Sequence, residues 1–249
     1  MSTGWHPTMT EPLTSYSRDE HGIVLIRLER AEARNAINTQ MLGELLEHLR
    51  TAREDPEVRV LVISSNDQMG LSAGADVRED LDEEGRVRRM ELWAEFYDAL
   101  TAFPRPTVAA CHGACVGGGA EIAIACDLRV GGSNLRLRFP GAALGVPVGP
   151  ARLVTLVGLS VAKYALLTAR EIAIDDAHRW GIVHKVAPAA ATEDAALKMA
   201  EGVAQLDPEG VARLKSMLHE HDGVVERSAA EGRGQVEWQR TGPGLPYRP

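Results

Sequence analysis

The chain has 249 residues and a formal net charge of −8, from 27 Lys and Arg against 35 Asp and Glu. This length suits one large domain or two small ones, and the 45% share of hydrophobic residues excludes an intrinsically disordered chain. The acidic balance excludes binding to the phosphate backbone of nucleic acid as the main activity, because such binding needs a basic surface. A few local cations would still suffice to hold a small anionic ligand.

No signal peptide is predicted, because residues 1–16 contain no apolar run. The least charged long stretch, residues 106–126, is interrupted by four glycines and by Glu121, so no membrane span is expected there. All three cysteines lie in this stretch, at Cys111, Cys115 and Cys126. Their number is odd, and no further Cys or His stands at ligand spacing. We therefore expect three reduced, buried thiols, no metal site and a cytoplasmic protein.

Strand and helix patterns alternate along the first half of the chain. Alternating or β-branched runs predict strands at residues 15–18, 23–28, 59–64 and 106–111, with the first two forming a hairpin. Helical periodicity predicts helices at residues 37–52 and 87–103, the second preceded by a very acidic stretch. From residue 148 onward we expect mostly helix, apart from a small strand near 182–186 and an extended tail at 241–249. This order of elements favours a layered α/β core.

Two glycine-rich segments, residues 70–76 and 113–121, are the strongest functional signals. The first contains G-x-S-x-G around Ser72, the pattern of a hydrolase nucleophile elbow. An elbow serine ends a buried strand and directly precedes a helix. Here the strand pattern ends well before the motif, and mostly charged residues follow it at 76–80. A serine hydrolase using Ser72 is therefore a remote alternative. The second segment lacks the G-x-G-x-x-G spacing of a dinucleotide-binding turn.

The two glycine segments together suggest an oxyanion hole. Each follows a strand pattern and can leave a backbone N–H group pointing into a cleft, and the second leads into a short helix whose N-terminus carries positive partial charge. Two such N–H groups from separate turns can hold the oxygen of a thioester as it becomes an enolate. Small residues let the acyl group approach the backbone closely. The alternative interpretation is that both segments are only tight turns.

Residues 72–76 and 106–129 resemble the enoyl-CoA hydratase/isomerase (crotonase) family. Residues 34–37 resemble the first CoA-contacting loop of that family, and three further matches follow in the family's order at 144–145, 156–158 and 176–183. The resemblance covers roughly residues 15–186. It implies an α/β, ClpP/crotonase-like core of repeated β-β-α turns over residues 1–190. A helical C-terminal region with an extended tail would follow at 191–249 and assemble homotrimers or dimers of trimers.

The resemblance also implies a set of site residues. The backbone N–H groups of Ala75 and Gly118 would form the oxyanion hole, and Glu121 matches one of the two catalytic carboxylates of the family's hydratases. The acyl-CoA substrate, which brings coenzyme A itself and needs no separate cofactor, would contact Arg34, Ala73, Asp76, Val77, Arg78, Gly117, Pro140 and Gly141. Burial of Glu121 in an apolar run would raise its pKa and suit it to proton transfer. The alternatives are a structural glutamate paired with an arginine and, for Arg78, a solvated surface side chain.

One feature of the family's hydratases is missing. Their second carboxylate directly follows a proline, but Gly141 follows Pro140 here, and residues 128–170 contain no Asp or Glu at all. Loss of one partner of a general acid–base pair typically costs about 10²–10⁴ in rate, so efficient hydration is not expected. Other donors could come from Glu79, Asp80, Glu91 or His112. The two hypotheses are an acyl-CoA enzyme that uses the enolate-stabilising hole with Glu121, and an acyl-CoA-binding protein with little or no chemistry.

Overall fold

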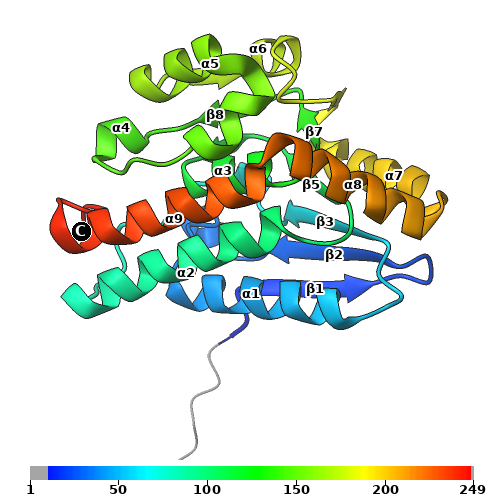
Figure 1. Ribbon diagram of the computed structural model, residues 1–249, viewed down its shortest axis with the longest axis horizontal. Coiled ribbons are helices and arrows are strands. Elements are labelled where there is room, and N and C mark those ends of the chain that lie inside the picture. Colours follow the sequence, from blue (N-terminus) through cyan, green and yellow to red (C-terminus); the bar gives the residue numbers. More distant parts are fainter. Residues whose placement is uncertain (1–10, 248–249) are drawn as a thin grey trace, which may run out of the picture.

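The computed structural model describes residues 11–247, and its helices surround two β-sheets (Figure 1). The prediction that no signal peptide is present concerns mainly residues 1–10, which lie outside the described residues. The larger sheet has six strands in the order β1 (Thr14–Arg18), β2 (Ile23–Leu28), β3 (Val60–Ser65), β5 (Thr107–Cys111), β7 (Leu128–Gly132) and β10 (Lys185–Ala187). Only β1 and β2 pair antiparallel, as the predicted hairpin requires, and the other neighbours are parallel.

The smaller sheet carries the glycine turns. Its strands follow the order β4 (Gly70–Ser72), β6 (Ala114–Val116), β8 (Arg136–Arg138) and β9 (Glu171–Ala173). Three of these strands are parallel, and β8 pairs antiparallel with β9. None of the four was predicted. Three-residue strands are too short to show an alternating pattern in the sequence.

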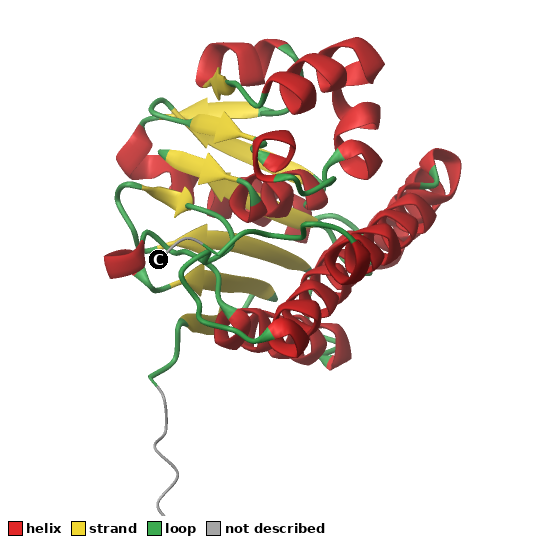
Figure 2. Cartoon of the chain, turned by 90° about the vertical axis from the view of Figure 1, so that its left-hand side faces the viewer, coloured by secondary structure: helices red, strands yellow, loops and turns green. Residues whose placement is uncertain are grey.

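Successive side chains of the central strands point to opposite faces of the larger sheet, and an apolar cluster covers each face. Ile23 and Leu25 of β2 pack on one face with helix α7 (Thr192–Ala204), in a small apolar cluster. Val24 and Ile26 point the other way, into the main core. That core also holds the buried faces of α1 (Thr39–Glu54), α2 (Glu83–Thr101) and α3 (Gly118–Ala125). Figure 2 shows the strands one above another in the middle of the molecule, with helices outside them.

Helix α2 begins four residues before its predicted start at 87. Asp82 caps it by accepting a hydrogen bond from the Gly85 N–H, and Glu83 and Glu84 occupy the first turn. Carboxylates there stabilise the helix because they face the positive end of its dipole. The acidic stretch that seemed only to precede the helix is therefore its N-terminus.

The remaining helices follow β8. They are α4 (Gly141–Leu144), α5 (Pro150–Thr168), α6 (Ile174–Arg179), α8 (Pro208–Asp222) and α9 (Val224–Thr241). Short 3-10 turns lie at Ala31–Ala33, before α1, and at Ala189–Ala191, before α7. Helix α9 lies along α2 (Figure 1), and Ser228 Oγ of α9 donates to Asp98 Oδ1 of α2 at 3.0 Å. The separation of residues 191–249 from the core stays a prediction. In the structure α7 covers a face of the large sheet and α9 packs on α2.

The apolar stretch 106–126 forms β5, β6 and the buried helix α3 inside the core. A different helix, α5, is long and apolar enough by length and composition alone to cross a membrane. The core helices of soluble proteins can be equally long and apolar, so these two properties alone do not indicate a membrane span. Helix α5 is also interrupted at Gly158, whose backbone has φ 75° and ψ 159°. The three cysteines are free and buried, as predicted.

Candidate active site

The two glycine turns meet at one edge of the small sheet. Strands β4 and β6 are parallel neighbours, so the turns that follow them leave the sheet at the same end. Gly74 has φ +92°, and a Cβ atom there would lie 2.6 Å from the Val116 carbonyl oxygen and 3.1 Å from the Gly118 nitrogen. Only glycine allows this backbone conformation together with so close an approach. The proximity of the turns therefore depends on Gly74.

Each turn leaves one backbone N–H group without an acceptor. Ile37 donates to the Gly74 carbonyl and accepts from the Asp76 N–H, both at 2.8 Å, which leaves the Ala75 N–H between them without a partner within residues 11–247. Gly118 is the first residue of α3, so its N–H has no acceptor within the helix, and no other described residue accepts from it. Both N–H groups are therefore free to donate to a ligand, and their role as a two-donor oxyanion hole stays a prediction.

Gly118 is also required to be glycine. A Cβ atom at this position would lie 2.4 Å from the Trp93 ring of α2. Trp93 is buried and packs near Tyr97, with 5.1 Å between the ring centroids. The aromatic side chains of α2 thus come directly against the start of α3, and neither was singled out from the sequence.

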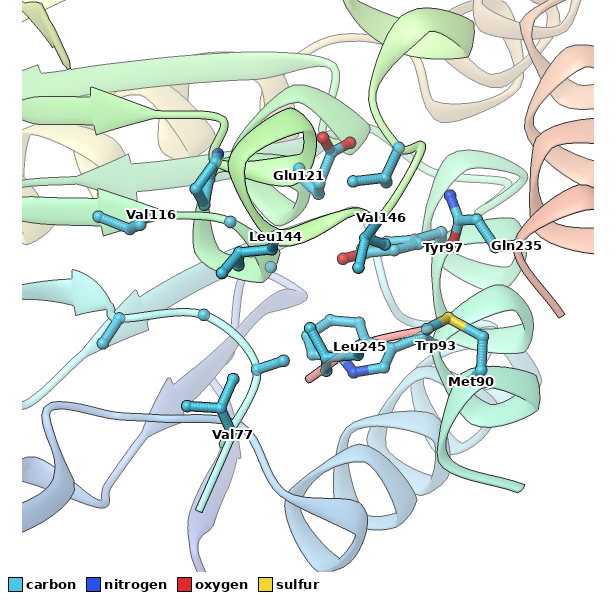
Figure 3. Close-up of a pocket in the computed structure, with 18 residues that line it drawn as sticks. Val77, Met90, Trp93, Tyr97, Val116, Glu121, Leu144, Val146, Gln235 and Leu245 are labelled. Atoms are coloured by element: carbon cyan, nitrogen blue, oxygen red, sulfur yellow. The ribbon is translucent and has the colours of Figure 1, made fainter. Parts of the chain in front are cut away.

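A cavity of about 220 Å³ is lined by Ala75 and Gly118, the residues that carry the two N–H groups. Figure 3 shows the residues that line this cavity. Its wall includes both turns, the segment from Pro140 to Val148 and three side chains of α2. Those side chains are Met90, Trp93 and Tyr97. Gln235 of α9 and Leu245 of the C-terminal segment complete the wall. Most of these side chains are apolar, as in sites that hold the hydrocarbon part of a small ligand.

Eight of the eleven residues expected at the site line this cavity. They are Ala73, Ala75, Val77, Gly117, Gly118, Glu121, Pro140 and Gly141. Arg34 and Arg78 do not line it and are exposed. The carboxylate of Asp76 is buried and does not line the cavity either. It accepts from Arg30 Nη1 at 2.6 Å and from the Arg78 N–H at 3.0 Å, so it fixes the first turn.

Glu121 is almost completely buried, with 1% of its surface exposed. Its Oε2 accepts from Arg152 Nη2 at 2.9 Å, whereas its Oε1 is buried without a hydrogen-bond partner in the described chain. Burial raises the pKa of Glu121 to about 7, although the nearby Arg152 guanidinium acts to lower it. A carboxyl with such a pKa can take up or release a proton near neutral pH.

Arg152 of α5 links Glu121 to a second glutamate. Its Nη2 also donates to Glu231 Oε1 of α9 at 2.8 Å, its Nη1 donates to Ser228 Oγ at 2.9 Å, and its guanidinium lies 4.7 Å from the Tyr97 ring centroid. Burial by itself lowers the pKa of Arg152, but the two glutamates raise it above its usual value, so the guanidinium stays charged. The sequence alternative of a glutamate paired with an arginine therefore describes Glu121 correctly, although the same side chain lines the cavity.

Glu231 also holds the start of α5. Its two carboxylate oxygens accept from the Gly149 N–H at 3.1 Å and the Ala151 N–H at 2.8 Å. Gly149 has φ +109°, and a Cβ atom there would lie 2.8 Å from Glu121 Oε1. Glu231 was not predicted as a site residue, because the groups that it binds lie at the start of α5, about 80 residues earlier in the chain.

No second carboxylate lines the cavity among the described residues. Gly141 begins α4, and a Cβ atom there would lie 2.4 Å from the Val146 carbonyl oxygen, so this backbone has no room for a side chain. Glu79 instead accepts from the Thr39 N–H at 3.0 Å, and Glu91 accepts from Arg240 at 2.8 Å.

The other proposed donors lie elsewhere. Asp80 is exposed and outside the cavity. The His112 ring contacts the Asp67 carbonyl oxygen at 2.8 Å, which is a structural role, and does not line the cavity either. Glu121 is therefore the single carboxylate that residues 11–247 contribute to the cavity wall.

Ser72 ends strand β4, contrary to the expectation that no strand would reach it. Its Oγ donates to the Asn35 carbonyl at 2.6 Å and accepts from the Gly74 N–H at 3.0 Å. The next α-helix, α2, begins only at Glu83, so the strand–turn–helix of a nucleophile elbow is not formed. Ser72 holds the first glycine turn in place. Within residues 11–247, no group of three or more His, Cys, Asp or Glu side chains is placed to hold a metal ion.

A protein-family model described as enoyl-CoA hydratase/isomerase matches residues 18–236, most of the chain. The chain belongs to this family. Its fold is the crotonase fold, an α/β architecture with two mixed sheets and C-terminal helices. Membership identifies an acyl-CoA enzyme of the hydratase and isomerase type.

Relatives and solved structures agree with this assignment. The chain is 34% identical over 210 residues to the 2,3-dehydroadipyl-CoA hydratase of Escherichia coli, covering 82% of this chain and 80% of the relative. It is 32% identical over 228 residues to a protein of Arabidopsis thaliana named probable enoyl-CoA hydratase 2, mitochondrial, covering 88% and 74%. The crystal structure of an enoyl-CoA hydratase from Bacillus anthracis matches with a TM-score of 0.80 and 25% identity over 95% of this chain and 99% of that one. An enoyl-CoA hydratase from Mycobacterium smegmatis matches with a TM-score of 0.79 and 28% identity, covering 91% and 90%.

Proposed function

We propose that this enzyme forms the enolate of an acyl-CoA thioester and moves one proton with a single carboxylate. The backbone N–H groups of Ala75 and Gly118 would hold the thioester oxygen, where negative charge develops as the enolate forms. Glu121 would take up and return the proton. The observation that carries this proposal is that Glu121 is the single carboxylate of the described cavity wall, beside two unpaired N–H donors.

The reaction that fits one carboxylate best is movement of a double bond along the acyl chain. Glu121 would take a proton from carbon 2 of a 3-enoyl-CoA, and the electron pair would spread to the thioester oxygen. Glu121 would then return the same proton to carbon 4, which gives the 2-enoyl-CoA with no net gain or loss of atoms. No water and no second acid are needed.

Efficient hydration is not part of the proposal. Addition of water to an enoyl thioester uses two carboxylates around one water molecule in the hydratases that this chain resembles. Glycine stands at position 141, where the second would be, and a Cβ atom there would meet the Val146 carbonyl oxygen. The hydratase names of the relatives therefore do not transfer directly to this chain.

We further propose that coenzyme A approaches along the exposed side of the first turn. Ala73 and Val77 line the cavity there, and the exposed Arg78 lies on the same turn. The exposed Arg34 lies on the neighbouring loop, where its carbonyl accepts from the Ala73 N–H at 3.0 Å. Guanidinium groups suit the CoA phosphates on charge and geometry. Assembly into homotrimers or dimers of trimers and a cytoplasmic location stay predictions.

Proton exchange at carbon 2 tests the enolate directly. Butyryl-CoA would be incubated with the enzyme in ²H₂O, and deuterium incorporation would be followed by mass spectrometry. A panel of 2-enoyl- and 3-enoyl-CoA substrates would be assayed for isomerisation and hydration alongside. We expect exchange and isomerisation to exceed hydration, and Glu121→Gln to lower exchange by about 10²–10⁴. Glu171→Gln, which changes an exposed glutamate outside the cavity, is the matched control.

The outcomes separate the candidate functions. Exchange at the wild-type rate in Glu121→Gln would show that another group moves the proton. Tight binding of acyl-CoA with no exchange and no turnover would favour an acyl-CoA-binding protein, the second candidate. The ion pair of Glu121 with Arg152 favours that candidate, since it occupies one of the two carboxylate oxygens.

A further inference from the structure

The C-terminal segment after α9, residues 242–247, folds back over the cavity. Leu245 lies there with only 7% of its surface exposed, belongs to the main core and contributes to the cavity wall. In Figure 3 it lies on the same side of the cavity as Trp93. An extended tail was expected from the sequence, but a buried leucine at the active site was not.

The contacts of this segment determine which part of the cavity it closes. Trp238 Nε1 of α9 donates to the Gly145 carbonyl at 2.7 Å, and Pro243 lies 3.7 Å from where a Cβ atom of Gly145 would be. The Leu245 N–H donates to Gln239 Oε1 of α9 at 3.0 Å. The segment is thus held against the loop that follows Gly141 and against α9. Within residues 11–247, no hydrogen bond joins it to the turn of Ala73 to Arg78, which we assign to coenzyme A.

The cavity that results is small and apolar. Its volume of about 220 Å³ is below the ~300–1,000 Å³ of most ligand pockets. An apolar protein cavity of roughly 150 Å³ holds one benzene molecule, which has six carbon atoms. On that scale the space takes about nine non-hydrogen atoms, and the thioester group uses several of them.

We propose that Leu245 is a specificity-determining residue that ends the acyl cavity and restricts the enzyme to short, apolar acyl groups. This inference rests on the proposed function, because it takes the cavity as the acyl site. The chain's own C-terminal segment sets the length of acyl group that fits. It is held to α9 by the Gly242 N–H, which donates to the Trp238 carbonyl at 2.8 Å, and by the Leu245 N–H, which donates to Gln239 Oε1. Shortening the leucine side chain opens room for about three further carbon atoms.

Binding of unreactive acyl-CoAs tests the proposal without requiring turnover. Affinities of saturated acyl-CoAs from acetyl- to decanoyl-CoA would be measured by calorimetry. While the chain still fits, each added methylene should tighten binding about fourfold, from roughly 0.8 kcal/mol per buried CH₂ at 1.4 kcal/mol per tenfold change. In the wild type the gain should stop at a short chain. In Leu245→Ala it should continue for about two to three more carbons, and in Leu245→Trp it should stop earlier.

Two further variants keep the test decisive. Leu206→Ala removes the same atoms from an exposed leucine that does not line the cavity, and its chain-length profile should match the wild type. A chain ending at Gly242 removes Leu245 entirely and should behave like Leu245→Ala or extend the profile further. Circular dichroism and melting curves would confirm that each variant is folded.

The results distinguish this inference from the function on which it rests. Acyl-CoA binding with the same chain-length profile in the wild type, in Leu245→Ala and in the shortened chain would overturn the role of Leu245 and leave the proposed function intact. Failure of the folded wild type to bind any acyl-CoA would overturn both.

Discussion

Replacement of Arg152 by methionine tests how the buried charges control Glu121. Methionine fills a similar volume but removes the guanidinium that bridges Glu121 and Glu231, whose oxygens lie 2.9 and 2.8 Å from Arg152 Nη2. Arg152 exposes 2% of its side chain and Glu121 1%. The variant therefore leaves two buried carboxylates close together without their cation.

The expected loss of stability follows from this burial. Removing one partner of a buried ion pair costs about 3–5 kcal/mol, because the remaining charge has lost its compensation. For a chain of this size, about 1 kcal/mol lowers the melting temperature by roughly 2–4 °C, so we expect a fall of about 6–20 °C near neutral pH. Arg179→Met is the control, since Arg179 is 71% exposed and pairs with Asp176 on the surface. Its loss should cost less than about 1 kcal/mol.

The catalytic readout is the pH dependence of proton exchange at carbon 2. Glu121 must be ionised to take up a proton, so wild-type exchange should rise with pH through the Glu121 pKa of about 7. Arg152 acts to lower that pKa. Two unit charges 4 Å apart interact by about 4 kcal/mol at an effective dielectric constant of about 20, which corresponds to about three pKa units as an upper bound. We expect the midpoint in Arg152→Met to rise by at least about one pH unit.

The sign of the stability change with pH is a separate check. The pKa of Glu121 is higher in the folded chain than in the unfolded chain, so this group stabilises the fold below the unfolded pKa near 4.3 and loses that contribution as pH rises toward 7. Removal of Arg152 raises the folded-state pKa of Glu121 further and so widens the gap between its unfolded and folded pKa values. The variant should therefore be less destabilised at pH 5, where Glu121 is protonated in the folded chain, than at pH 8. Arg152→Lys keeps the charge and should keep the exchange midpoint near that of the wild type. A wild-type midpoint in Arg152→Met, or a melting temperature no lower than that of Arg179→Met, would refute the reasoning.

Two further predictions concern other positions. Gly141→Glu should not restore hydration, because its Cβ atom would lie 2.4 Å from the Val146 carbonyl oxygen, and it should cost about 1–3 kcal/mol as the loop moves. Hydration assays and urea unfolding check both points, and a hydration rate raised a hundredfold or more would contradict the first. Asp127 accepts from Lys215 Nζ at 2.6 Å and from the Thr107 N–H at 2.7 Å. Burial alone raises the pKa of Asp127, but its contacts with His219, Lys215 and the Thr107 N–H lower it to about 2. Asp127→Asn should therefore cost about 2 kcal/mol at pH 7, a difference that persists above about pH 4 and shrinks as pH falls toward 2 in urea titrations. An unchanged difference at pH 2 would show that the charge is not its source.

Local patterns in the sequence were sufficient for much of the fold. The hairpin of β1 and β2, the helix α1 and the parallel strands β3 and β5 follow from alternation, helical spacing and β-branched runs, and the structure has each of them. The small sheet could not be predicted, since its strands have three residues each and pair across long stretches of chain.

The site, like the fold, could be predicted only in part from the sequence. The residue types of the oxyanion hole, the lone Glu121 and the missing acid at Gly141 were visible in the sequence, because motif spacing and the absence of Asp and Glu from 128–170 are local properties. The partners of Glu121 were not visible. Glu231 is 110 positions from Glu121 in the chain (231 − 121), and nothing near either residue indicates the other.

By itself, the sequence determined the family, the order of the main elements and the chemistry available at the glycine turns. The tertiary structure alone decided that Arg152 bridges Glu121 and Glu231, and that Leu245 contributes to the cavity wall. The physical reason is that glycine geometry and side-chain periodicity act between near neighbours in the chain. Burial and charge pairing depend instead on which distant segments pack together.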